Sequence, residues 1–278
     1  MTVAALLALI IVGFAVGFLA GLVGIGGGVL IVPFLYFFYD HAGWSGIGLA
    51  SALHAPVAHA TSLLIIVPTA IAGTVTYARS GLVAWRVVIP VAVFSMLLAA
   101  AAASVATRLP PEALKVAFGT FLLITAVQLL RKPAMTTQGP QRTSILLSAL
   151  TGAAVGIFSA MLGVGGGLVA IPLLIYVLRL DMRYVAATSL AIVAFAATAG
   201  ALTYMLTGVD VAGLPSGHVG YVHLYAALPM LPGAMLAARW GAKLNQRMGG
   251  HKLRYLFAVM FAVLGLNLVV RHVGLLLG

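Results

Sequence analysis

The chain has 278 residues, of which 63% are hydrophobic and only 7% are charged. A soluble protein of this length needs far more polar surface, so that class is excluded. The apolar runs continue over about twenty residues, whereas a transmembrane β-barrel has short alternating strands. The sequence therefore predicts an all-α polytopic membrane protein. Cysteine is absent, which excludes disulfides and thiolate chemistry.

The net charge of +11 arises from fifteen Lys and Arg residues against four Asp and Glu residues. In a soluble protein this excess would suggest a nucleic-acid partner. Here the basic residues stand at the ends of apolar segments, where they orient a chain in the bilayer. We therefore expect the lipid bilayer, and no nucleic acid, as a partner. A positive field also attracts small anions.

Ten apolar segments follow in chain order, five in each half. In the first half they are expected at 3–23, 28–39, 55–78, 85–107 and 112–130, and in the second at 143–162, 167–178, 185–206, 220–244 and 252–274. Eight of them have about twenty residues or more, which suffices to cross ~30 Å of hydrocarbon. Segments 28–39 and 167–178 are too short, because twelve residues of helix span only about 18 Å.

The two halves share a sequence repeat. Gly24–Pro33 and Gly163–Pro172 both read Gly-x-Gly-Gly-Gly-x-x-x-x-Pro, and Ala60–Leu63 recurs as Ala187–Leu190. These matches indicate that both halves descend from one unit. The predicted domains are a first transmembrane repeat at 1–135, a polar cytoplasmic linker at 136–142 and a second repeat at 143–278.

The basic residues decide between two topologies for the glycine runs. If each run reverses the chain direction, twelve Lys and Arg fall on one side of the membrane and three on the other; if each is only a kink, the division is nine against six. The positive-inside rule favours the reversals. Both termini are then outside, and the two repeats have inverted topologies. Each repeat begins with a re-entrant hairpin whose glycine tip lies near the membrane midplane.

The glycine tips are candidate substrate-binding elements. Each leads directly into a new helix, whose first N–H groups are free and carry about half a positive charge. Glycine also lets a ligand approach the backbone closely, so two such tips suit a small oxyanion. The alternative is close helix packing through small residues, which we expect for the pairs Gly13/Gly17 and Gly152/Gly156. The candidate glycines are Gly24, Gly26, Gly27, Gly28, Gly163, Gly165, Gly166 and Gly167.

Hydroxyl side chains accompany the repeat at Thr61, Ser62, Thr188 and Ser189. They could donate hydrogen bonds to an anion, so they join the predicted substrate site. Alternatively, each hydroxyl bonds to a carbonyl of its own helix, four residues earlier. The sequence leaves both alternatives open.

Two histidines and two tyrosines complete the candidates. His54 and His59 are possible proton carriers for coupled transport, although a histidine near a helix end is often simply interfacial. Tyr77 and Tyr204 lie near segment ends, where we expect them to belong to the aromatic belt.

The chain lacks the residues that other functions require. None of its four carboxylates lies in mid-span, which disfavours a cation pathway. It contains no Gly-x-Ser-x-Gly, His-Glu-x-x-His or Walker A motif. We therefore predict no enzyme activity, no catalytic residues, no metal site and no cofactor.

With its paired glycine motifs, its two Ala-Thr-Ser-Leu stretches and Leu231–Met235, the chain resembles the TauE/SafE sulfite exporter family. That resemblance implies a multi-pass permease of the bacterial inner membrane for small sulfur-containing anions, such as sulfite or C2-sulfonates. The predicted function is a secondary transporter that alternates access around a midplane site formed by both glycine tips. An anion channel and a permease for small organic carboxylates are the alternatives.

Overall fold

The computed structural model describes residues 1–130, 144–247 and 251–277, without the side chains of 129–130, 251–258, 260 and 274–277. The first half contains α1 (Val3–Val23), α2 (Gly28–Asp40), α3 (Ala42–Ser45), α4 (Ser51–Ala78), α5 (Trp85–Ala106) and α6 (Pro111–Leu130). The second half contains α7 (Ile145–Leu162), α8 (Gly167–Tyr176), α9 (Met182–Thr207), β1 (His218–Val219), β2 (Val222–His223), α10 (Leu224–Asn245) and α11 (His251–Leu277). The predicted linker 136–142 lies outside the described residues.

The helices follow the predicted apolar segments, and the fold is an all-α membrane protein. Among the described residues, α1, α4, α5, α7 and α9 are long and apolar enough to cross a membrane, whereas α2 and α8 are short apolar helices. The eight long predicted segments correspond to eight helices of 18–28 residues, and these five also meet the hydropathy criterion. The predicted start of the segment at 220 is wrong, because β1 and β2 pair as an antiparallel hairpin that ends immediately before α10.

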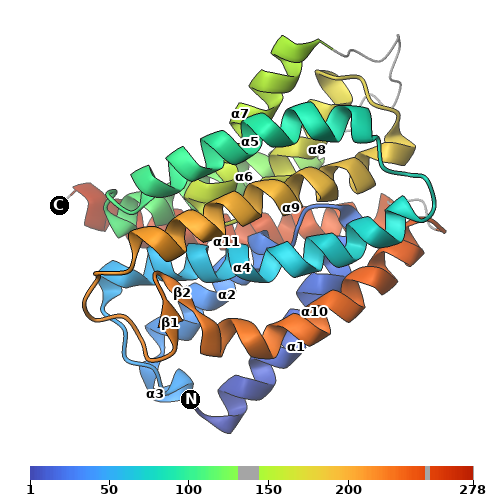
Figure 1. Ribbon diagram of the computed structural model, residues 1–278. Helices are drawn as coiled ribbons and strands as arrows, with labels where there is room; N and C mark the ends of the chain where they lie inside the picture. The colour runs from blue at the N-terminus through green and yellow to red at the C-terminus, as the bar shows by residue number, and fades with distance from the viewer. Residues whose placement is uncertain (131–143, 248–250, 278) are drawn as a thin grey trace.

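The helices from the two halves pack against each other. Helices α4 and α9 form a central pair, and each has 78% of its most apolar stretch buried. Figure 1 shows this pair between two others, in which α1 packs on α10 and α5 packs on α7. Helix α6 packs on α11. In Figure 1, α3 and the β hairpin lie at the left, and the α4–α5 and α8–α9 connections lie at the right.

Small residues let the outer pairs approach closely. A Cβ atom on Gly17 would lie 2.1 Å from the carbonyl oxygen of Ala234, and one on Gly156 would lie 2.3 Å from that of Ser95. Gly13 and Gly152 meet α10 and α5 in the same way. The prediction that these four glycines serve helix packing is confirmed.

The aromatic-belt prediction for Tyr77 and Tyr204 is wrong. Both side chains are buried, with 1% and 0% of their surface exposed. The Tyr77 hydroxyl donates a hydrogen bond to the Gly21 carbonyl over 2.8 Å, and the Tyr204 hydroxyl donates to the Ala160 carbonyl over 3.0 Å. Each tyrosine thus ties the second long helix of its half to the first.

We expect Tyr77→Phe and Tyr204→Phe to destabilise the protein by similar amounts, about 1 kcal/mol each. Each change removes the hydroxyl that donates a hydrogen bond to a carbonyl of α1 or α7 while keeping the aromatic ring. Thermal unfolding in detergent would measure the effect, with the exposed Tyr225→Phe as the control. Unchanged stability in either variant would contradict this role.

Candidate functional site

The site is built from two turns that break helices in the same manner. Helix α1 ends at Gly24, which has φ = 80°, and α2 begins after Gly26 and Gly27, with φ = 84° and 83°. Their equivalents Gly163, Gly165 and Gly166 have φ = 66°, 79° and 78°. Side chains disfavour this left-handed backbone, so glycine is required at these six positions.

The two turns lie against each other. A Cβ atom on Gly28 would lie 2.6 Å from the Gly163 carbonyl oxygen, and one on Gly167 would lie 2.4 Å from that of Ile25. The first residue of α2 therefore touches the turn before α8, and the first residue of α8 touches the turn before α2. We call this contact between Gly24–Gly28 and Gly163–Gly167 the glycine junction.

Backbone donors remain free on both sides of the glycine junction. In the described part of the chain, the N–H groups of Gly26–Val29 and Gly165–Leu168 make no hydrogen bond to a backbone acceptor. Both sets belong to turns that start a helix, where the helix dipole adds partial positive charge. Residues 26–28 and 165–167 are buried. The junction thus concentrates hydrogen-bond donors without a charged side chain.

Ser62 and Ser189 join the two halves at the glycine junction. The Ser62 hydroxyl donates to the Gly163 carbonyl over 2.7 Å, and the Ser189 hydroxyl donates to the Gly24 carbonyl over 3.0 Å. The alternative in which these hydroxyls bond to their own helices is therefore wrong. Instead, each serine binds the glycine turn of the other half, and both serines are fully buried.

Thr61 and Thr188 also have equivalent roles in the two halves, but as hydrogen-bond acceptors. The Thr61 hydroxyl accepts a hydrogen bond from the backbone N–H of His223 over 3.0 Å, and the Thr188 hydroxyl accepts one from that of Ala84 over 3.1 Å. His223 and Ala84 precede α10 and α5, so each threonine satisfies a donor at the start of a helix from the other half. Burial lowers the pKa of His223 to about 4, which keeps its ring neutral.

Of the two predicted histidines, only His59 reaches the glycine junction. Its Cα lies 2.6 Å from the position of a Cβ on Gly163, and its Nε2 is 2.5 Å from the Tyr36 hydroxyl. Both Tyr36 and His59 are buried. His54 instead lies near the start of α4, where its Nδ1 is 2.7 Å from a carboxylate oxygen of Asp40.

A cavity of about 400 Å³ lies beside His54. Lys115 of α6 lines this cavity, although only 5% of the residue is exposed. We call this cavity the Lys115 pocket. It is lined by Asp40, His41, His54, Lys115, Arg271 and His272.

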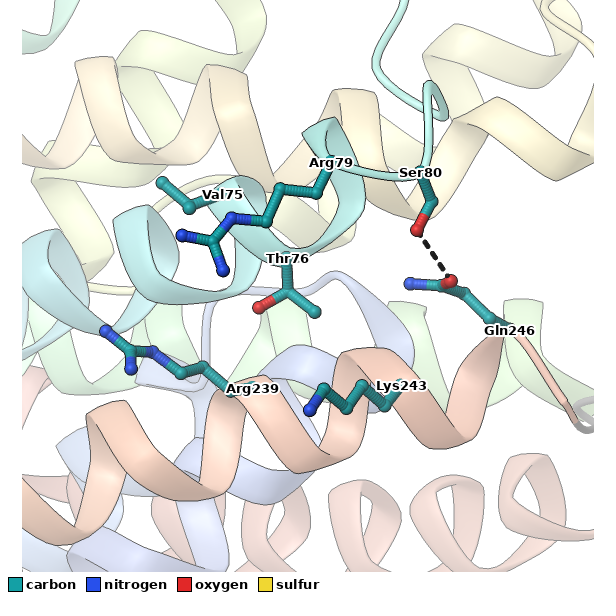
Figure 2. A pocket seen from close by; sticks show the side chains of 7 residues that line it. All are labelled: Val75, Thr76, Arg79, Ser80, Arg239, Lys243 and Gln246. Atoms are coloured by element: carbon teal, nitrogen blue, oxygen red, sulfur yellow. Dashed lines mark hydrogen bonds between the residues drawn. The ribbon is translucent and has the colours of Figure 1, made fainter.

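A second cavity, of about 300 Å³, lies beyond the other end of α4. Figure 2 shows Arg79, Arg239 and Lys243 around one opening between the end of α4 and α10, where the Ser80 hydroxyl donates to the Gln246 side chain over 3.0 Å. We call it the Arg239 pocket. Its lining is Val75, Thr76, Arg79, Ser80, Arg239, Lys243 and Gln246, with no carboxylate.

Sequence reasoning missed Tyr36 and both pockets. A signal was available for Arg239 and Lys243, which are four residues apart and therefore share one face of a helix. Lys115 was visible as a basic residue near the start of the apolar segment 112–130. No local pattern pairs Tyr36 with His59, because their contact joins separate helices.

Comparison with known proteins places this chain, over more than nine-tenths of its length, among membrane transporters. A family profile described as sulfite exporter TauE/SafE matches residues 9–268. A probable membrane transporter of Methanocaldococcus jannaschii is 27% identical over 263 residues, 93% of each chain. The probable membrane transporter YunE of Bacillus subtilis is 24% identical over 279 residues, 94% of this chain and 96% of its own. No solved structure matches the chain. These relatives are named as transporters and not as enzymes, in agreement with the prediction.

Proposed function

Because the chain belongs to the TauE/SafE sulfite exporter family of membrane transporters, we propose that it is a secondary transporter of small sulfur-containing anions, sulfite or C2-sulfonates. The observation that carries this proposal is the glycine junction, where two broken helices bring free N–H groups together between the two halves. Helix N-termini of this kind bind oxyanions in many proteins. Broken helices at a repeat interface are also a common transporter design.

An inverted arrangement of the two repeats is part of the proposal. Helix α1 of the first half packs on α10 of the second, and α7 of the second half packs on α5 of the first. This exchange is what a two-fold relation between the repeats requires. Together with the positive-inside bias it supports outside termini and a cytoplasmic linker. The bacterial inner membrane is proposed from the family alone.

The charges of the two pockets favour an anion over a cation. The Lys115 pocket and the Arg239 pocket lie at opposite ends of α4, and each contains at least two Lys or Arg residues. The three cations of the Arg239 pocket face no carboxylate in its lining. Cationic clefts raise the local concentration of anions and their rate of entry.

We propose alternating access at the glycine junction. The two tips are in contact, so an anion would cross only when the halves separate there. The carbonyl oxygens of Gly163 and Gly24 would repel an anion, but each already accepts a hydrogen bond, from Ser62 and Ser189 respectively. The N–H groups then face the anion. His59 is the histidine placed to couple protonation to this movement, because it contacts Gly163.

Flux through proteoliposomes tests the proposed function. Purified protein should accumulate labelled sulfite or a C2-sulfonate, with saturation and with counterflow against unlabelled anion on the opposite side. Flux that rises linearly without counterflow would instead identify an anion channel. Preferential movement of acetate-sized carboxylates would identify the carboxylate permease, and flux of neither class would refute the proposal.

A further inference from the structure

Lys115 is a buried cation without an acidic partner. It lies on α6 with only 5% of its surface exposed, and its nitrogen is 5.7 Å from the centroid of the Tyr36 ring. In the described part of the chain it makes no ion pair, although Glu112 stands one turn earlier on the same helix. The aromatic ring offsets part of the cost of burying the ammonium group. The remaining cost favours an anion in the adjoining pocket.

The acid that lines the Lys115 pocket already has a side-chain partner. The Asp40 carboxylate is 2.7 Å from His54 Nδ1, and His54 Nε2 is 2.9 Å from the Leu49 carbonyl. A carbonyl only accepts hydrogen bonds, and an ionised carboxylate does the same. The His54 ring therefore lies between these two acceptors, and the Asp40 carboxylate is paired with His54 and not with Lys115. The pocket retains the charges of Lys115 and Arg271.

We propose that the Lys115 pocket is a capture site for a small dianion on the pathway to the glycine junction. This inference rests on the proposed function, because it names where an anion is first held. Lys115 of α6 and Arg271 of α11 line the same cavity from two helices. A C2-sulfonate with a second negative group offers one anionic group to each of these two cations. A cavity of about 400 Å³ has room for it. Arginine adds a fork of donors that suits carboxylate and sulfonate oxygens.

A chain of contacts connects this pocket to the glycine junction. Lys115 lies over the Tyr36 ring, the Tyr36 hydroxyl bonds to His59, and His59 packs against Gly163. One tyrosine and one histidine thus separate the pocket from the turn that precedes α8.

The first experiment measures binding without transport. Detergent-solubilised protein is treated with an amine-acetylating reagent, and modification of Lys115 is quantified by mass spectrometry. Sulfoacetate, with two negative charges, should slow acetylation of Lys115 at least about fivefold. Isethionate, a C2-sulfonate with one charge, should protect less at the same concentration. Equal protection by both anions would refute the dianion preference, and no protection by either would refute the site.

Variants separate the pocket from general charge effects. Arg271→Gln should abolish protection of Lys115, whereas Arg108→Gln should retain it. Arg108 is the matched control because it precedes α6 at the same end of that helix but does not line the pocket. Loss of protection in both variants would indicate non-specific screening and would refute the inference.

A transport measurement distinguishes this inference from the proposed function. Lys115→Gln should raise the KM for sulfoacetate about tenfold while the maximal rate changes little, and Lys115→Arg should remain close to wild type. If the wild type transports sulfoacetate and the Lys115→Gln and Arg108→Gln variants have equal KM values, the capture site alone is refuted. Protection of Lys115 without any anion flux would refute the proposed function alone.

Discussion

Gly28→Ala and Gly167→Ala are each expected to abolish most anion flux and to destabilise the protein by about 1–3 kcal/mol. The added methyl group on residue 28 would lie 2.6 Å from the Gly163 carbonyl oxygen and 2.7 Å from the Val164 Cα. On residue 167 it would lie 2.4 Å from the Ile25 carbonyl oxygen. Backbone atoms cannot rotate away as a side chain can, so the two turns must separate.

Flux into proteoliposomes and thermal unfolding of the same preparation measure this prediction. Gly233→Ala is the matched control, because Gly233 lies in the interior of α10 and its added methyl would have no neighbour closer than 3.4 Å. That variant should gain about 0.5–1 kcal/mol from helix propensity and keep its flux. Normal flux and stability in Gly28→Ala would show that the close contact at the junction is not needed.

Ser62→Ala and Ser189→Ala are expected to have equal effects, about 1–2 kcal/mol each on stability and a fall in flux of at least about tenfold in the double variant. Each change leaves a buried glycine carbonyl, at Gly163 or Gly24, without the hydroxyl that crosses to it from the other half. The freed carbonyl oxygens would then face the anion and repel it.

Ser95→Ala is the control for the serine variants. Its hydroxyl is equally buried but donates to the Ala92 carbonyl within its own helix, which the helix already satisfies. We expect little change in its unfolding temperature or flux. A marked effect of Ser62→Ala without an effect of Ser189→Ala would contradict a matched role for the two halves.

The sequence was sufficient to place the helix breaks. Consecutive glycines in an apolar run, at matching positions of two repeats, predicted the ends of α1 and α7 and the short helices α2 and α8. The prediction that Gly13 and Gly17 pack against a neighbouring helix was also correct. These features are local, because glycine conformation, apolar length and residue spacing act along a single segment.

Side-chain roles were predicted less well. The serines were assigned to an anion or to their own helices, and the structure joins them to the opposite glycine turn. The tyrosines at 77 and 204 were assigned to the membrane interface, yet both are buried donors to a neighbouring helix. A hydroxyl has several possible acceptors within one helix turn, and only the packing of two helices selects among them.

By itself, the sequence determined the class of the protein, the paired breaks in its helices and its family. Hydrophobicity, glycine and charge spacing are properties of consecutive residues, so they can be read along the chain. Only the tertiary structure decided that the two glycine turns touch, that His59 lies beside Gly163 while His54 holds Asp40, and that Lys115 reaches a cationic pocket. These contacts join residues from different helices and often from different halves, and their free energy exists only once the helices have packed.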